Sequence, residues 1–172
     1  MFDAAMDHTA IAVRSIAAAV PLVRDALGGR FLFAGDVPAR GFRWAQFQLP
    51  GGGKFELVTP LGQDSFLARF LDRRGEGVHH VTLKVADIGA AIQHLETRGV
   101  RLVDVSLEGE GWKEAFIHPK DAHGTLIQIA ESAWSDEDMA RHHVSDHADG
   151  DHRHLTLEEI LAAEASPVRP AG

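Results

Sequence analysis

Asp7-His8-Thr9-Ala10-Ile11-Ala12-Val13 is the first of two similar stretches in this chain. The second, His79-His80-Val81-Thr82-Leu83-Lys84-Val85, follows at an offset of 72 residues. The same offset relates Phe55-Glu56-Leu57 to Ile127-Gln128-Ile129, so the similarity extends well beyond one strand. A repeat of this length that closes after two copies is not a solenoid. It indicates one domain that is built from two similar halves.

Each half has the pattern of a strand, a helix and three further strands. Alternating apolar residues predict the strands, and helical spacing predicts the helices. We expect strands over 6–13, 30–36, 41–49, 54–59, 78–85, 100–105, 112–118 and 124–131. Helices are expected from the Ser15 cap to Leu27, with a kink at Pro21, and over 88–98 after the cap Asp87. The predicted fold class is α+β, with two βαβββ modules forming a curved sheet cleft and helices outside.

The expected domain organisation is one two-module domain followed by a tail. The domain spans 1–132, with modules at 6–60 and 78–132 and a linker helix at 64–73 that Asp64 could cap. Residues 133–172 form an acidic, His-rich tail with a short C-terminal helix. Its charged stretch 141–154 is expected to be disordered. Helical spacing returns over 155–165, where Thr156 and Glu159 have capping-box spacing.

Composition excludes several classes of protein. The chain has 172 residues, of which 45% are hydrophobic, and it has no cysteine, which excludes disulfides and thiolate metal sites. A net charge of −8 argues against nucleic acid as a partner. Ten acids and three arginines give residues 131–172 a net charge of −7, so residues 1–130 carry only −1 and do not repel an anionic substrate. No segment is long enough to span a membrane, and we expect a cytoplasmic protein.

Four polar residues occupy matched positions of the repeat. His8 corresponds to His80 and Glu56 to Gln128, and alternation places all four on the strand faces that do not pack against helices. Each could be an ordinary strand residue with its own hydrogen-bond partner. Together, two imidazoles, a carboxylate and an amide oxygen suit a divalent Co, Zn, Ni, Mn or Fe ion and leave positions open for a substrate. The pattern therefore predicts a metal site.

Several segments resemble one family: Asp7 to Val13, Pro60 to Ser65, Arg74 to His80, His118-Pro119-Lys120 and Gly124 to Gln128. Over 6–132 the chain resembles the vicinal oxygen chelate (glyoxalase/bleomycin resistance/dioxygenase) superfamily, and within it the methylmalonyl-CoA epimerases. The resemblance implies two βαβββ modules around a divalent metal.

The resemblance also assigns roles to residues of this chain. It puts His8 and His80 in the histidine-ligand places, and Glu56 and Gln128 in the other two. The last two look exchanged, since the epimerases have glutamine in the first module and glutamate in the second. A further departure is Trp44, which stands where the epimerases have a glutamate that acts as a base. His79 is expected to face away from its neighbour His80.

The implied function is that of a metal-dependent isomerase or lyase that stabilises an enolate of a small substrate. Glu56 is the predicted catalytic residue, and the substrate is expected to be an acyl-CoA such as methylmalonyl-CoA. Predicted substrate-binding residues are Trp44, Gln46 and Lys120, with Arg40 and Arg43 as further phosphate contacts. Lys84, Lys113 and Glu114 are secondary candidates for proton transfer, although Glu114 shares the Phe116 face and is expected to point away.

Other functions remain open at this point. A glyoxalase-type lyase would use the same donors. An Fe(II) ring-cleaving dioxygenase would use two histidines and one carboxylate, but in related enzymes the carboxylate lies where this chain has Gln128. A non-catalytic small-molecule binding protein is a third possibility, against which the four donors count. We expect a homodimer that binds neither nucleic acid nor membranes.

Overall fold

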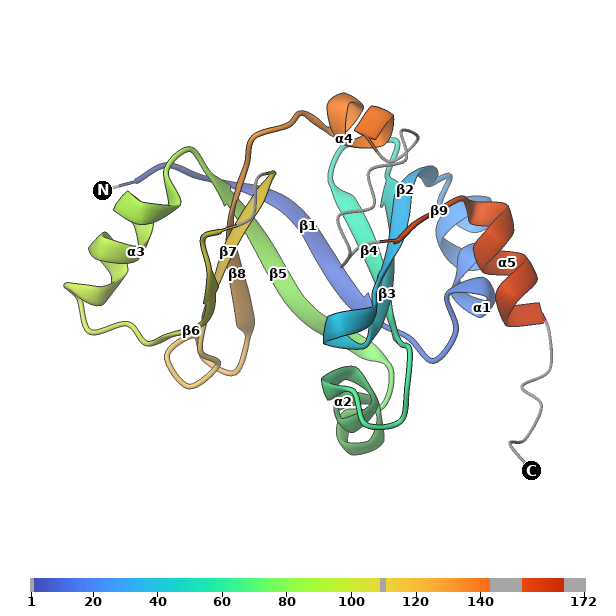
Figure 1. The fold of residues 1–172 in the computed structure, drawn as a ribbon, viewed down its shortest axis with the longest axis horizontal. Coiled ribbons are helices and arrows are strands. Elements are labelled where there is room, and N and C mark those ends of the chain that lie inside the picture. Colours follow the sequence, from blue (N-terminus) through green and yellow to red (C-terminus); the bar gives the residue numbers. More distant parts are fainter. Residues whose placement is uncertain (1, 109–110, 143–152, 166–172) are drawn as a thin grey trace. The chain divides into compact units, whose positions relative to one another are not determined.

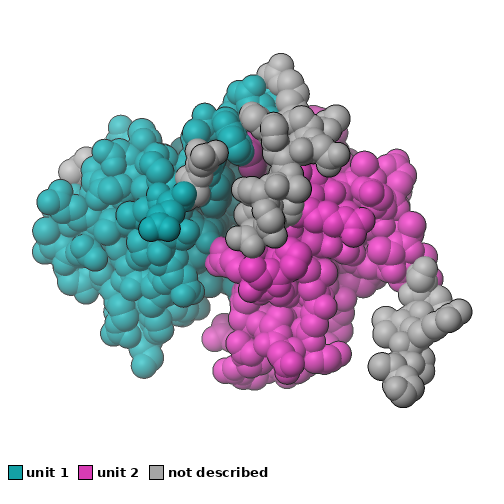
Figure 2. Space-filling model, viewed as in Figure 1, with its two compact units in different colours: residues 1–10, 78–138 teal, residues 11–77, 139–172 magenta. Residues whose placement is uncertain are grey.

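The computed structural model of the chain describes residues 2–108, 111–142 and 153–165. Its contacts divide the chain into two compact units, each formed by two separate segments (Figure 2). Unit 1 comprises Met1–Ala10 and Val78–Asp138, and unit 2 comprises Ile11–Gly77 and Met139–Gly172. The assignment of 1–132 to one domain and 133–172 to a tail stays a prediction.

Two βαβββ modules and the α+β fold class are confirmed (Figure 1). The first module contains β1 (Ala4–Ala12), α1 (Ile16–Val20), η1 (Pro21–Ala26), β2 (Arg30–Val37), η2 (Pro38–Arg40), β3 (Phe42–Gln48) and β4 (Lys54–Pro60). After α2 (Phe66–Arg74), the second contains β5 (Gly77–Val85), α3 (Ile88–Glu96), β6 (Leu102–Ser106), β7 (Trp112–Ile117) and β8 (Leu126–Ser132). The later elements are α4 (Asp136–His142), β9 (Arg153–Leu155) and α5 (Leu157–Ala165).

In unit 1 the strand order is β6-β7-β8-β5-β1. β7 runs antiparallel to β6 and β8, whereas β5 and β8 are parallel, with Thr82 opposite Gln128. α3 begins at the predicted cap Asp87 and packs Ile88 and Ala91 against Ile129 of β8. Because side chains alternate along a strand, the other face of this sheet carries the polar residues of β5 and β8.

In unit 2, β4, β3, β2 and β9 form an antiparallel set in that order. α1 begins at Ser15, whose hydroxyl accepts from the Ala18 amide, and it passes into the wider π-helix η1 at Pro21. The kink predicted at this proline is thus a change of helix type. One face of the strands packs Phe47 and Leu57 under α1, and this is the main core of unit 2.

The helix α2 starts one residue later than a cap at Asp64 would give. Ser65 is its cap, because the Ser65 hydroxyl accepts from the Ala68 amide at 3.0 Å, so the prediction of Asp64 was wrong. Leu67 and Leu71 of α2 pack on Val58, which lies on the strand face opposite α1.

The C-terminal segment differs most from the prediction. Arg153–Leu155, expected to be disordered, forms β9 and pairs with β2, so the predicted loss of structure over 141–154 was wrong there. The end of the unpredicted helix α4 also overlaps this stretch, while 143–152 lies outside the described residues. α5 lies beside α1 and buries Ile160 in the core of unit 2 (Figure 1). None of the described helices is long and apolar enough to cross a membrane.

The predicted capping box at the start of α5 is confirmed. The Thr156 amide donates to Glu159 Oε2 at 2.7 Å, and the Glu159 amide donates to Thr156 Oγ1 at 3.2 Å. Each side chain thereby satisfies an amide that the helix itself leaves without an acceptor.

Candidate metal centre

Two predicted ligands, His8 and His80, come together in unit 1 on the neighbouring strands β1 and β5. Their ring centroids are 5.8 Å apart, and each ring has a nitrogen within 4.8 Å of one of the other ring. That separation is comparable to twice a metal–nitrogen bond of about 2.1 Å. Both side chains are buried, with 2% and 8% of their surface exposed. The two imidazoles are thus placed to serve one ion.

The residue before each histidine contacts its Nδ1 atom. His8 Nδ1 donates to Asp7 Oδ2 at 2.6 Å, since a carboxylate can only accept. His80 Nδ1 lies 2.9 Å from His79 Nδ1, so the two rings share a hydrogen there. The assignment of His79 to the opposite strand face stays a prediction. Burial lowers the pKa of His79 from 6.5 to about 4, which keeps its ring neutral near pH 7. Both predicted ligand rings are therefore oriented through Nδ1, with Nε2 turned to the other side.

The third predicted ligand of unit 1, Gln128, is linked to His8 through a threonine. Thr82 Oγ1 donates to Gln128 Oε1 at 2.6 Å and lies 2.9 Å from His8 Nε2. Thr82 is fully buried. It follows His80 by two residues on the same strand face, so alternation alone could have identified it.

Glu114 lies next to Gln128 rather than away from it. Gln128 Nε2 donates to Glu114 Oε2 at 2.6 Å, and Trp112 Nε1 donates to the same oxygen at 3.1 Å. The expectation was wrong because the face that Glu114 shares with Phe116 is also the face of Gln128. The register pairs Phe116 directly with Gln128, and its ring centroid lies 5.9 Å from that of His80. Phe116 and Glu114 consequently share the face of the ligands.

Lys84 closes these contacts into a ring. Its Nζ lies 3.2 Å from Asp7 Oδ1, 3.5 Å from Asp136 Oδ1 and 5.7 Å from the centre of the Trp112 ring. We call the resulting set the polar ring. Its members are Asp7, His8, Thr82, Gln128, Glu114, Trp112 and Lys84. All lie in unit 1, so one compact unit fixes three of the four predicted ligands.

The fourth predicted ligand, Glu56, belongs to unit 2. It lies opposite Gln46 on the neighbouring strand, and Gln46 Nε2 donates to Glu56 Oε2 at 2.9 Å. Gln46 is buried, with 6% of its surface exposed, so the carboxylate has a fixed neighbour. The participation of Glu56 in one site with the unit 1 donors stays a prediction.

The predicted substrate-binding residues have varied surroundings. Trp44 is partly buried among Val58 and Leu67 under α2, with its ring centroid 5.7 Å from that of Phe33. Lys120 is exposed in the turn after β7. The Arg43 guanidinium forms two hydrogen bonds, of 2.6 and 3.0 Å, with the buried Asp36. This pairing raises the pKa of Arg43 and makes it a poor candidate for a phosphate contact.

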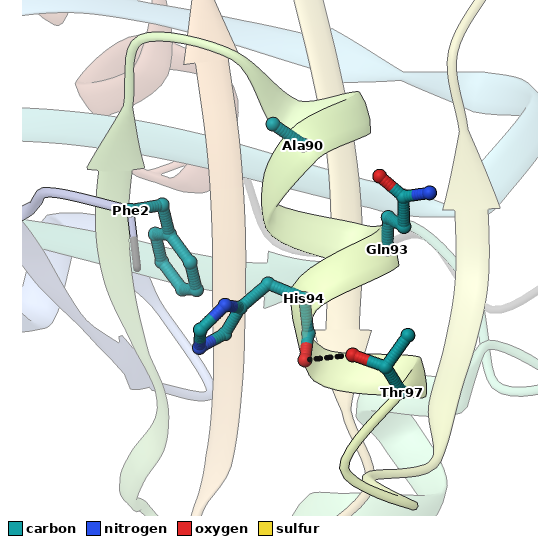
Figure 3. Close-up of a pocket in the computed structure, with 5 residues that line it drawn as sticks. All are labelled: Phe2, Ala90, Gln93, His94 and Thr97. Atoms are coloured by element: carbon teal, nitrogen blue, oxygen red, sulfur yellow. Dashed lines mark hydrogen bonds between the residues drawn. The ribbon is translucent and has the colours of Figure 1, made fainter.

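A shallow hollow of about 360 Å³ lies elsewhere in unit 1, beside α3 (Figure 3). Phe2 and His94 face one another there edge to face, with centroids 5.4 Å apart. Its other lining residues are Ala90, Gln93 and Thr97. None of these five side chains is a carboxylate or a permanent cation, so the hollow lacks the chemistry of the polar ring.

Comparisons with known proteins agree with this geometry. Residues 7–116 match the family model of the Glyoxalase/Bleomycin resistance protein/Dioxygenase superfamily. The chain is 32% identical over 130 residues to the mitochondrial methylmalonyl-CoA epimerase of Homo sapiens, covering 74% of this chain and 73% of that one. It is 34% identical over 128 residues to an ethylmalonyl-CoA/methylmalonyl-CoA epimerase of Cereibacter sphaeroides, covering 72% and 95%.

Comparison with solved structures points to the same proteins. The crystal structure of methylmalonyl-CoA epimerase from Mycobacterium tuberculosis matches with a TM-score of 0.69 and 36% identity, covering 75% of this chain and 88% of that one. The three proteins named above are epimerases of methylmalonyl-CoA, and the chain itself belongs to the glyoxalase/bleomycin resistance/dioxygenase superfamily, the vicinal oxygen chelate group that its sequence resembles.

Proposed function

We propose that this chain is a metal-dependent epimerase of a CoA thioester such as methylmalonyl-CoA. Its relatives carry that activity in their names, and one similar epimerase has been solved in complex with methylmalonyl-CoA. The observation that carries the proposal is the pair His8 and His80, buried side by side and each oriented through Nδ1.

The proposed metal ligands are His8, His80, Gln128 and Glu56. The donor set fits a divalent Co, Zn, Ni, Mn or Fe ion, because it combines two imidazole nitrogens with an amide and a carboxylate oxygen. When bound, such an ion supplies positive charge beside the thioester carbonyl oxygen. The proposal for Glu56 rests on its correspondence to Gln128 in the repeat.

Glu56 is the proposed catalytic residue. Its carboxylate takes the proton from the carbon next to the thioester carbonyl, exchanges it with solvent, and delivers a proton to the second face of the planar carbon. The Gln46 amide, which donates to Glu56 Oε2 at 2.9 Å, restricts the direction of that carboxylate. Because Trp44 cannot transfer a proton, we propose one base rather than two. Trp44, Gln46 and Lys120 remain the proposed substrate contacts.

Solvent deuterium incorporation tests the proposal. The metal-free protein is loaded with each of the five metals, mixed with methylmalonyl-CoA in D₂O, and deuterium at the carbon next to the thioester is followed by mass spectrometry. We expect exchange that depends on the metal and that Glu56→Gln lowers about 10²-fold or more. Glu96→Gln, an exposed carboxylate on α3, is the control.

Three outcomes would contradict the proposal. Full exchange in the Glu56→Gln variant would remove the assigned base. Oxygen uptake with Fe(II) would instead favour the ring-cleaving dioxygenase, and conversion of a thiol adduct of an α-ketoaldehyde would favour the glyoxalase-type lyase. The proposed homodimer is tested separately by light scattering.

A further inference from the structure

The second half of the chain has a neutral ligand candidate backed by a carboxylate. Gln128 Nε2 lies 2.6 Å from Glu114 Oε2, and both side chains are buried, with 6% and 5% of their surface exposed. Burying a carboxylate costs several kcal/mol unless it is hydrogen-bonded. An apolar residue would satisfy packing at this position of β7, so the buried charge points to a role beyond packing.

We propose that Glu114 is a positioning residue that holds the Gln128 amide with its oxygen toward the metal-binding histidines. The proposal rests on the proposed metal site and adds a residue to it. A carboxylate can only accept hydrogen bonds, so the amide atom beside it is the NH₂ group. The carbonyl oxygen Oε1 then has to lie on the other side, where Thr82 Oγ1 donates to it. A flipped amide would present hydrogens to the cation instead.

The carboxylate is itself held in place. Trp112 Nε1 donates to Glu114 Oε2 at 3.1 Å, and the Trp112 ring lies beneath Lys84 Nζ. The orientation of Gln128 is therefore fixed through the polar ring rather than through one flexible contact. Partners of this kind orient a ligand and increase the negative charge on its donor atom.

The same contact gives the second half a carboxylate, although its ligand candidate Gln128 is neutral where the first half has Glu56. Gln128 is neutral, but Glu114 places a negative charge one hydrogen bond behind it. The second half thus has a carboxylate at residue 114, directly behind its neutral ligand candidate. Combining Gln128→Glu with Glu114→Gln should preserve both the hydrogen bond between these two side chains and their total charge.

The test is a swap measured by Co²⁺ affinity, using titration calorimetry and the visible Co²⁺ spectrum. Glu114→Gln should weaken binding about 10- to 100-fold, because its amide no longer dictates which end of Gln128 faces the histidines. Gln128→Glu places two carboxylates side by side, so it should lower the melting temperature of the metal-free protein. The double variant E114Q/Q128E should recover most of the Co²⁺ affinity and of the melting temperature. Such a recovery would show that the effects of the two substitutions are strongly coupled, as expected for neighbouring residues.

The outcomes separate the two proposals. If the unsubstituted protein binds no Co²⁺, the proposed metal function fails, and the positioning role fails with it. If it binds Co²⁺ and Glu114→Gln binds equally well, only the role of Glu114 is overturned. Additive losses in the double variant would overturn it too. Glu96→Gln serves as the charge-matched control, and circular dichroism confirms folding of each variant.

Discussion

Glu164 of α5 accepts a hydrogen bond from the Ser15 hydroxyl at 2.6 Å and another from the Ala17 amide at 2.9 Å. It therefore binds the amino end of α1, where a negative charge is favoured by the aligned peptide dipoles. We expect Glu164→Ala to lower the free energy of unfolding by about 1–3 kcal/mol, because two donors lose a charged acceptor. Urea denaturation measures this, with the exposed Glu158→Ala as control. Equal stabilities of the two variants would contradict the structural role.

Ile160 tests whether the C-terminal segment belongs to the core of unit 2. Its side chain is fully buried with residues of α1 and β3. Ile160→Ala should lower the free energy of unfolding by about 2–5 kcal/mol, since a cavity remains where the side chain packed. The more conservative Ile160→Val should cost only about 0.5–1.5 kcal/mol. If Ile160→Ala lowered the free energy of unfolding by less than Ile160→Val does, α5 would contribute little to the stability of unit 2.

The repeat in the sequence was enough to select most residues of the candidate site. His8, His80 and Gln128 follow from matched positions and strand alternation, and the structure brings these three together in unit 1. The assignment of Glu114 failed because its face depends on the pairing of Phe116 with Gln128. Register between strands is set by three-dimensional packing, so a single strand's pattern does not reveal it.

The C-terminal strand shows a second limit of sequence patterns. β9 has three residues, too few for an alternating pattern, and its neighbour β2 is more than a hundred residues earlier in the chain. Pairing with Ala34, Gly35 and Asp36 supplies the order that local propensity does not. The Thr156 capping box lies wholly within four residues, and it was predicted correctly.

Glu131 should make stability depend on pH in the acid range. Lys113 Nζ lies 2.7 Å from its Oε1, and the Ile88 amide donates to its Oε2 at 2.9 Å; both contacts lower the pKa of Glu131 below 4.5. The unfolded chain therefore takes up this proton first as the pH falls. The stabilisation is present above pH 4.5 and is lost below it, toward the lower pKa of the folded state.

Glu131→Gln should flatten that part of the stability profile. Because the Glu131 side chain is partly exposed, the loss of stability at neutral pH should stay below about 1 kcal/mol. Urea denaturation between pH 3 and pH 7 measures it, with Glu96→Gln alongside. An unchanged acid slope in Glu131→Gln would mean that other carboxylates cause the pH dependence.

Asp7 should control metal affinity through His8 without touching the ion. Its Oδ2 accepts from His8 Nδ1 at 2.6 Å, which orients the ring and makes Nε2 a stronger donor to a metal. Asp7→Asn keeps an oxygen acceptor but removes the charge, and should weaken Co²⁺ binding about 10-fold; Asp7→Ala removes both and should weaken it up to about 100-fold. Equilibrium dialysis measures the affinities, with the exposed Asp3→Asn as the matched control. Weaker Co²⁺ binding by Asp7→Ala than by Asp7→Asn would separate the effect of ring orientation from that of charge. Equal affinity in Asp7→Ala, Asp7→Asn and Asp3→Asn would mean that the carboxylate plays no part in holding the histidine.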